Sequence, residues 1–169
     1  ADEVGHGAVA YRGSDGSVLW HKPGSKYVGP FIIHHDKLIA NSRSYAETSG
    51  VFSLLDGSPI LVENPLTGER EPWQYTRTYG CNTAVASEHL ITFRSGAAGY
   101  YDLNTKCGVG NLGGFRSGCS SNLIAADGVL NAPDFTRTCS CGYQNQSSLA
   151  LIHMPDVETW SLHGRAGKN

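Results

Sequence analysis

One short pattern recurs along this chain of 169 residues: an apolar run, a polar turn and a second apolar run. Three copies of the turn with its second run align at offsets of 52 and 39 residues, at positions 35–40, 87–92 and 126–131. A second feature, a polar corner, recurs at offsets of 52 and 38 residues, at Asp15-Gly16, Thr67-Gly68 and Thr105. Two features with matching offsets indicate that the chain repeats one structural unit.

The repeated unit is predicted to be built from β-strands. No window shows the apolar spacing of an amphipathic helix, whereas runs of four to six residues rich in β-branched and aromatic side chains end at turn residues. The 21 glycines supply many such turns, and Asp56-Gly57 between two apolar runs is a strong hairpin signal. We therefore expect an all-β fold.

A period of about 40 to 50 residues with four short strands is typical of a β-propeller blade. The chain is predicted to be one partial propeller domain over residues 1–169, made of four-stranded antiparallel blades. Residues 1–21 are interpreted as the end of one blade, followed by blades at about 29–73, 82–112 and 122–162. Because propellers close with about four to eight blades, about three and a half leave the ring incomplete.

The corner residues also resemble the quinoprotein (PQQ-type) propeller repeat, Ala-x-Asp-x-x-Thr-Gly-x-x-x-Trp. Ala10, Gly16 and Trp20 match that motif, Thr67, Gly68 and Trp73 form a second copy with one extra residue before the Trp, and Thr105 belongs to a third. The resemblance covers most of residues 8–153. It implies that Gly16, Thr67, Gly68 and Thr105 form outer turns, and that Trp20 and Trp73 pack between neighbouring blades.

Five cysteines are more than packing requires, and their spacing is poor for a zinc site. We predict an oxidised framework that joins Cys139 and Cys141 to Cys81 and Cys119 in either of two arrangements, with Cys107 as the odd thiol. The alternative is a thiolate metal site formed by the same four cysteines. The cysteines within the propeller pattern resemble the end of certain secreted PQQ-like propeller proteins of planctomycete-type bacteria. This framework predicts a secreted or periplasmic protein.

The chain offers no recognised catalytic motif. Its seven histidines form no metal-binding motif, and His34-His35 stands at a strand end, where neighbouring side chains are expected to point to opposite faces. We therefore predict no metal site and no catalytic residue. Arg77, Arg94 and Arg116 lie near cysteines or strand ends and are candidates for binding an anionic ligand, with bonds to main-chain carbonyls as the alternative interpretation.

These observations favour a non-catalytic propeller that acts as a scaffold, binding module or assembly subunit without a cofactor. The alternative is the C-terminal part of a PQQ-dependent alcohol or sugar oxidoreductase with PQQ and Ca²⁺. The partner is expected to be the remainder of the propeller or another chain that completes it, including a second copy. A net charge of −2 gives no reason to expect a nucleic-acid partner, and no apolar run is long enough to span a membrane.

Overall fold

The computed structural model describes residues 7–23, 27–42, 48–118, 122–133, 148–154 and 156. These residues form strands and turns without a helix, which confirms the all-β prediction, and thus no described segment is a helix that could cross a membrane. The strands are β1 (Ala8–Tyr11), β2 (Val18–Lys22), β3 (Tyr27–His34), β4 (Lys37–Ser42), β5 (Thr48–Ser53), β6 (Leu61–Glu63), β7 (Arg70–Pro72), β8 (Gln74–Thr76), β9 (Val85–Ala86), β10 (Leu90–Ser95), β11 (Ala97–Asp102), β12 (Val109–Asn111), β13 (Ile124–Ala126), β14 (Val129–Ala132) and β15 (Leu149–Ile152).

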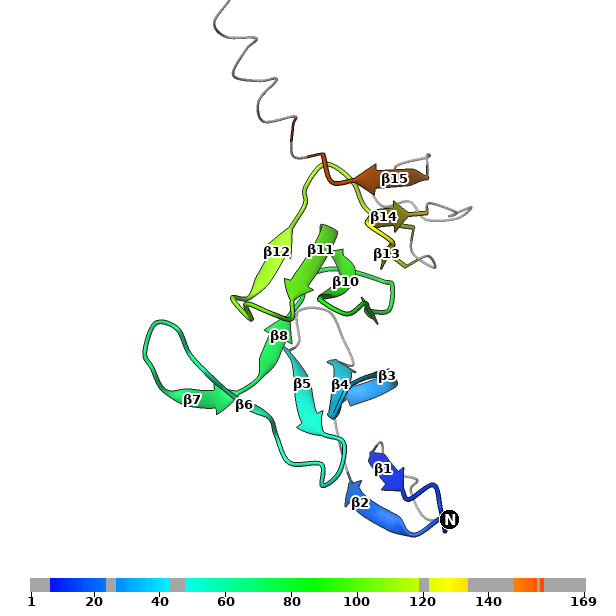
Figure 1. Cartoon of the computed structure of the whole chain (residues 1–169), viewed down its shortest axis with the longest axis vertical. Helices are drawn as coiled ribbons and strands as arrows, with labels where there is room; N and C mark the ends of the chain where they lie inside the picture. Colours follow the sequence, from blue (N-terminus) through cyan, green and yellow to red (C-terminus); the bar gives the residue numbers. More distant parts are fainter. Residues whose placement is uncertain are drawn as a thin grey trace, which may run out of the picture.

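The strands form antiparallel sheets that follow one another in chain order (Figure 1). Sheet I is the hairpin β1-β2, sheet II has the order β3-β4-β5-β8, sheet III has the order β12-β11-β10-β9, and sheet IV has the order β13-β14-β15. Four-stranded antiparallel sheets were predicted, and sheets II and III confirm them. The described sheets form an open series from β1-β2 to β15, and they do not form a closed ring.

Sheets II, III and IV each begin with a tight hairpin that has two turn residues. His34 pairs with Lys37, Ala126 pairs with Val129, and the Ser87 amide donates to the Leu90 carbonyl at 2.8 Å. The turn residues are therefore 35–36, 88–89 and 127–128. The first two turns lie 53 residues apart, one more than the sequence alignment predicted, because His35 rather than Asp36 corresponds to Glu88.

A second turn recurs at the outer end of the sheets, at positions 12–17, 53–58, 64–69 and 102–107. In each copy the fifth residue donates its amide to the carbonyl of the first, at 2.8, 2.9, 2.8 and 3.0 Å. The fifth residue has a left-handed φ of 73°, 69° and 72° at Gly16, Gly57 and Gly68, and of 55° at Lys106. Glycine suits this position because it has no Cβ to clash. The copy at 53–58 contains the hairpin predicted at Asp56-Gly57, and it was missing from the sequence alignment.

The outer strand of sheet II is interrupted by an inserted hairpin, β6-β7. Pro59 bridges to Phe52, and the Ile60 amide donates to the Val51 carbonyl at 3.0 Å. The chain then leaves the sheet, returns at Trp73, whose amide donates to the Ile60 carbonyl at 2.7 Å, and continues as β8 beside β5. The corner Thr67-Gly68 therefore belongs to this insertion, and the turn that connects β5 to the outer strand is 53–58.

Apolar side chains fill the spaces between successive sheets. Between sheets II and III the core contains Ile39, Val51, Trp73, Tyr75, Ala84, Ile91, Phe93, Tyr101 and Leu103. Between sheets III and IV it contains Ala98, Phe115, Leu123 and Ala132, with Leu130, Leu149 and Leu151 packed against them. Sheet III thus buries apolar side chains on both faces, as expected for a stack of repeats whose hydrophobic faces are covered by their neighbours.

Candidate functional site

Trp20 and Trp73 each lie against the outer turn of the following sheet. The Trp20 indole donates to the Leu54 carbonyl at 3.0 Å, and its Cδ2 would lie 2.8 Å from a Cβ at Gly57. The Trp73 side chain, 2 % exposed, donates from Nε1 to the Tyr101 hydroxyl at 2.7 Å, and the Lys106 ammonium lies 5.3 Å from its ring centre. Because glycine leaves room at Gly57, the indole can rest directly on that turn.

The remaining residues of the corner motif lie in exposed turns. Gly16 and Gly68 hold the left-handed position, and Thr67 accepts the Glu69 amide on Oγ1 at 3.3 Å. The Thr105 amide donates to the Asp102 carboxylate at 3.3 Å. Such side-chain bonds favour the turn conformation locally.

The Tyr101 hydroxyl links Trp73 to the outer turn of sheet III, since it also donates to the Lys106 carbonyl at 3.3 Å. Burial is the main cause that raises the pKa of Tyr101 from 10.0 to about 12. The folded state therefore favours the neutral phenol. The raised pKa of Tyr101 therefore contributes to the stability of the fold. This contribution is complete below pH 10 and is lost as the pH rises toward 12.

We expect Tyr101→Phe to be less stable by about 1–3 kcal/mol near pH 8, because the buried Trp73 N–H loses its acceptor. Between pH 10 and 12 the wild type should lose stability more steeply than the variant. Urea unfolding at several pH values measures both effects. Parallel stability curves for the two proteins across pH 10–12 would contradict the assignment.

The three candidate arginines make main-chain contacts at the junction of sheets II, III and IV. Arg77 Nη1 donates to the Asn82 carbonyl at 2.6 Å, Arg94 Nε to Gly96 at 3.5 Å, and Arg116 Nη1 to Ser117 at 3.0 Å. The side chains of Arg94 and Arg116 are each only 1 % exposed. These hydrogen bonds to main-chain carbonyls give each arginine a structural role. Ligand binding by Arg77, Arg94 and Arg116 stays a prediction.

Asn82 organises this junction. Its Oδ1 accepts the Arg94 amide at 2.9 Å, and its Nδ2 donates to the Ser117 hydroxyl at 2.7 Å. Asn82 is 3 % exposed and Ser117 is fully buried. One side chain therefore ties the segments that enter and leave sheet III. The sequence showed no signal for Asn82, because its partners are 12 and 35 residues away.

The cysteine prediction falls largely outside the described residues. Cys81 and Cys107 are exposed, and no disulfide joins any two residues that the structure describes. The Cys107 thiol donates to the Thr105 carbonyl at 3.3 Å. Cys119, Cys139 and Cys141 lie outside the described residues, so their pairing with Cys81 stays a prediction.

A hollow of about 630 Å³ lies between sheets III and IV. Its apolar lining includes Leu90, Leu112, Phe115, Leu130 and Leu151, and its other lining residues include Glu88, His89, Asp127 and His153. This lining suits an apolar group.

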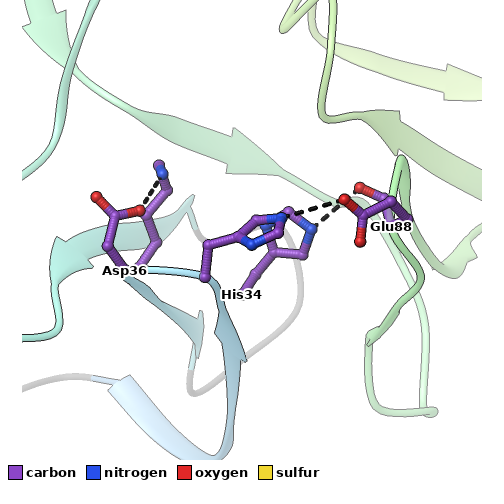
Figure 2. Close-up of polar contacts among 5 residues, drawn as sticks. His34, Asp36 and Glu88 are labelled. Carbon is purple, nitrogen blue, oxygen red and sulfur yellow. Dashed lines mark hydrogen bonds and ion pairs between the residues drawn. The ribbon is translucent and has the colours of Figure 1, made fainter.

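His34, His35 and Glu88 come together where sheet II meets sheet III (Figure 2). His34 Nε2 donates to the main-chain oxygen of Glu88 at 3.0 Å, and His35 Nε2 contacts Glu88 Oε1 at 3.2 Å. The two imidazole rings meet edge to face with their centres 4.4 Å apart. We call these three residues the His-His-Glu cluster. The potential ligand atoms of its three side chains all lie within 4.8 Å of one another.

The alternation of side chains along a strand predicted that His34 and His35 would point to opposite faces. The structure differs because His35 is the first turn residue and has a left-handed φ of 53°. This backbone conformation turns its ring toward the side of His34. Asp127, in the equivalent turn of sheet IV, has a φ of 49°, so the conformation belongs to the hairpin. The sequence also could not show that Glu88, 53 residues away from His35, would lie opposite.

No protein-family model matches the sequence, and a search of curated proteins returned no match. The likeness to the PQQ-type repeat therefore rests on the sequence motifs described above.

Proposed function

We propose that this protein is a non-catalytic, secreted or periplasmic PQQ-like propeller module that acts as a scaffold by assembling with further copies of itself. The proposal rests on one observation: the two ends of the sheet series present apolar faces with no described residues packed on them. A stack of repeats needs its terminal faces to be covered. A second copy can cover them in the way that each inner sheet covers its neighbour.

The outer face of sheet I is apolar. Tyr11 pairs with Val18 and Val9 with His21, so these side chains share the face opposite to Trp20. Tyr11, Val18 and Val9 are 62 %, 58 % and 40 % exposed. The adjacent turn is also open, because a Cβ at Gly16 would meet no atom within 4 Å, whereas one at Gly57 would meet Trp20.

The outer face of sheet IV is mainly apolar as well, with Asn131 as a polar residue beside Ile124. Ala126, Val129 and Ile152 pair side by side on this face, next to Ile124. Ile152 and Ile124 are 61 % and 45 % exposed. The two end faces belong to different sheets, so contact between them would be head to tail. Contacts of this kind form rings or filaments according to whether the rotation closes.

The proposal is tested with one charged substitution on each end face, Tyr11→Lys and Ile152→Lys. In sedimentation velocity over a range of concentrations, the wild type should associate and each variant alone should remain monomeric. An equimolar mixture should form a dimer of one copy of each, because each variant keeps the face that the other has lost. A lysine on a buried apolar contact costs several kcal/mol, enough to break the association.

Leu66→Lys is the matched control for that experiment. Leu66 is 93 % exposed on the inserted hairpin, away from both end faces, so this variant should associate as the wild type does. A wild type that stays monomeric at high concentration, or a mixture that fails to dimerise, would contradict assembly through these faces. Dye-linked alcohol or sugar oxidation with added PQQ and Ca²⁺ would contradict the non-catalytic part of the proposal and favour the oxidoreductase alternative.

A further inference from the structure

We propose that the His-His-Glu cluster binds a divalent transition-metal ion of the zinc class and thereby joins sheet II to sheet III. This site goes beyond the proposed assembly and does not depend on it. Two imidazoles and a carboxylate are a ligand set that zinc and its neighbours in the first transition row accept. The water-exposed side leaves room for solvent to complete the coordination.

The geometry requires only small side-chain adjustments. Ligand atoms around a tetrahedral zinc ion lie about 3.3 Å apart for bonds of about 2.0–2.1 Å. In the cluster the potential ligand atoms lie within 4.8 Å of one another, and His35 Nε2 is already 3.2 Å from Glu88 Oε1. The side chains of His35 and Glu88 are 60 % and 67 % exposed, so their rotation meets little resistance.

The surroundings also favour a cation. His34 Nε2 bonds the Glu88 carbonyl, so Nδ1 is the ring nitrogen of His34 that would bind the ion, and such a bond on the second nitrogen is common for metal-binding histidines. Lys37, the first residue of β4 after the turn, forms an ion pair with Asp36, which is labelled in Figure 2. The Asp36 carboxylate therefore balances the charge of Lys37, and the Glu88 carboxylate remains available to bind the ion.

The position of the cluster indicates what the ion would do. His34 and His35 come from the end of β3 and the β3-β4 turn, and Glu88 comes from the β9-β10 turn. These turns belong to different sheets that are linked by few contacts at this end. An ion bound only in the folded state would stabilise the junction by mass action.

The test is a titration of the full chain with Zn²⁺, followed by isothermal calorimetry and by thermal unfolding. The wild type should bind one ion at the cluster and unfold at a higher temperature when zinc is present. His34→Gln, His35→Gln and Glu88→Gln should each weaken this binding by at least about ten-fold and abolish the thermal shift. His89→Gln is the matched control, because His89 occupies the same turn as Glu88 and lies outside the cluster.

Exposed thiols also bind zinc, so the titration is repeated with Co²⁺. Thiolate complexes of Co²⁺ show sulfur-to-metal charge transfer in the near ultraviolet, which complexes of histidine and carboxylate lack. The wild type and His89→Gln should show a visible Co²⁺ spectrum without thiolate bands. This spectrum should be absent from the three cluster variants. Equal binding by all five proteins, or binding by thiolates alone, would overturn the proposal.

Discussion

Replacing Trp73 with alanine is expected to lower the free energy of unfolding by about 3–5 kcal/mol. Trp73 is 2 % exposed and lies between sheets II and III, with its ring centre 6.0 Å from that of Tyr101. The substitution removes the largest side chain of this core and leaves a cavity that Tyr75 and Tyr101 cannot fill without leaving their own ring contacts. It also removes the N–H that the buried Tyr101 hydroxyl accepts.

Equilibrium unfolding in urea measures this loss, and two comparisons identify its cause. Trp73→Phe should recover part of the lost stability because it refills the cavity without restoring the hydrogen bond. Trp20→Ala should cost less than half as much, because Trp20 is only half-buried. Equal losses for Trp20→Ala and Trp73→Ala would show that burial between the sheets does not determine the effect.

Replacing Gly80 with alanine is expected to destabilise the protein by about 3 kcal/mol, at the upper end of the usual cost of overpacking. A Cβ at Gly80 would lie 2.2 Å from the main-chain oxygen of Arg94 and 2.9 Å from its carbonyl carbon. Main-chain atoms cannot rotate away as a side chain can. The segment between β8 and β9 would therefore have to separate from β10, to which Asn82 and Thr78 of the same segment also form hydrogen bonds.

Gly13→Ala is the matched control, because a Cβ at Gly13 would meet no atom within 4 Å. Its free energy of unfolding should stay within about 0.5 kcal/mol of the wild-type value. Both variants are compared by urea unfolding and by the hydrogen-exchange protection of β10. A Gly80→Ala protein as stable as Gly13→Ala would mean that this segment does not approach Arg94 as closely as the structure shows.

Much of the strand pattern was predictable from the sequence because it depends on neighbours in the chain. The apolar run within 87–92 becomes part of β10 (Leu90–Ser95), and Asp56-Gly57 forms the expected hairpin. The insertion of β6-β7 was not predictable. Its corner, Thr67-Gly68, repeats the local turn signal of Gly16, and only the bonds of Val51 with Ile60 and Trp73 show which turn belongs to sheet II.

The candidate sites depended still more on contacts between distant residues. Arg94 and Arg116 were singled out by sequence, but Asn82, which binds the Arg94 amide and Ser117, was not. The expectation that His34 and His35 would lie on opposite faces was wrong, because alternation applies within a strand and His35 is already in the turn.

By itself, the sequence determined the all-β class, the repeated hairpins and the turn positions that require glycine, because these follow from side-chain periodicity and local backbone sterics. Only the tertiary structure decided which sheet covers each tryptophan, where the outer strand is interrupted, and that Glu88 meets two histidines. The physical reason is that these features are contacts between successive sheets. The way the repeats stack decides which residues meet in these contacts. No local pattern in the sequence encodes a contact between residues that are far apart in the chain.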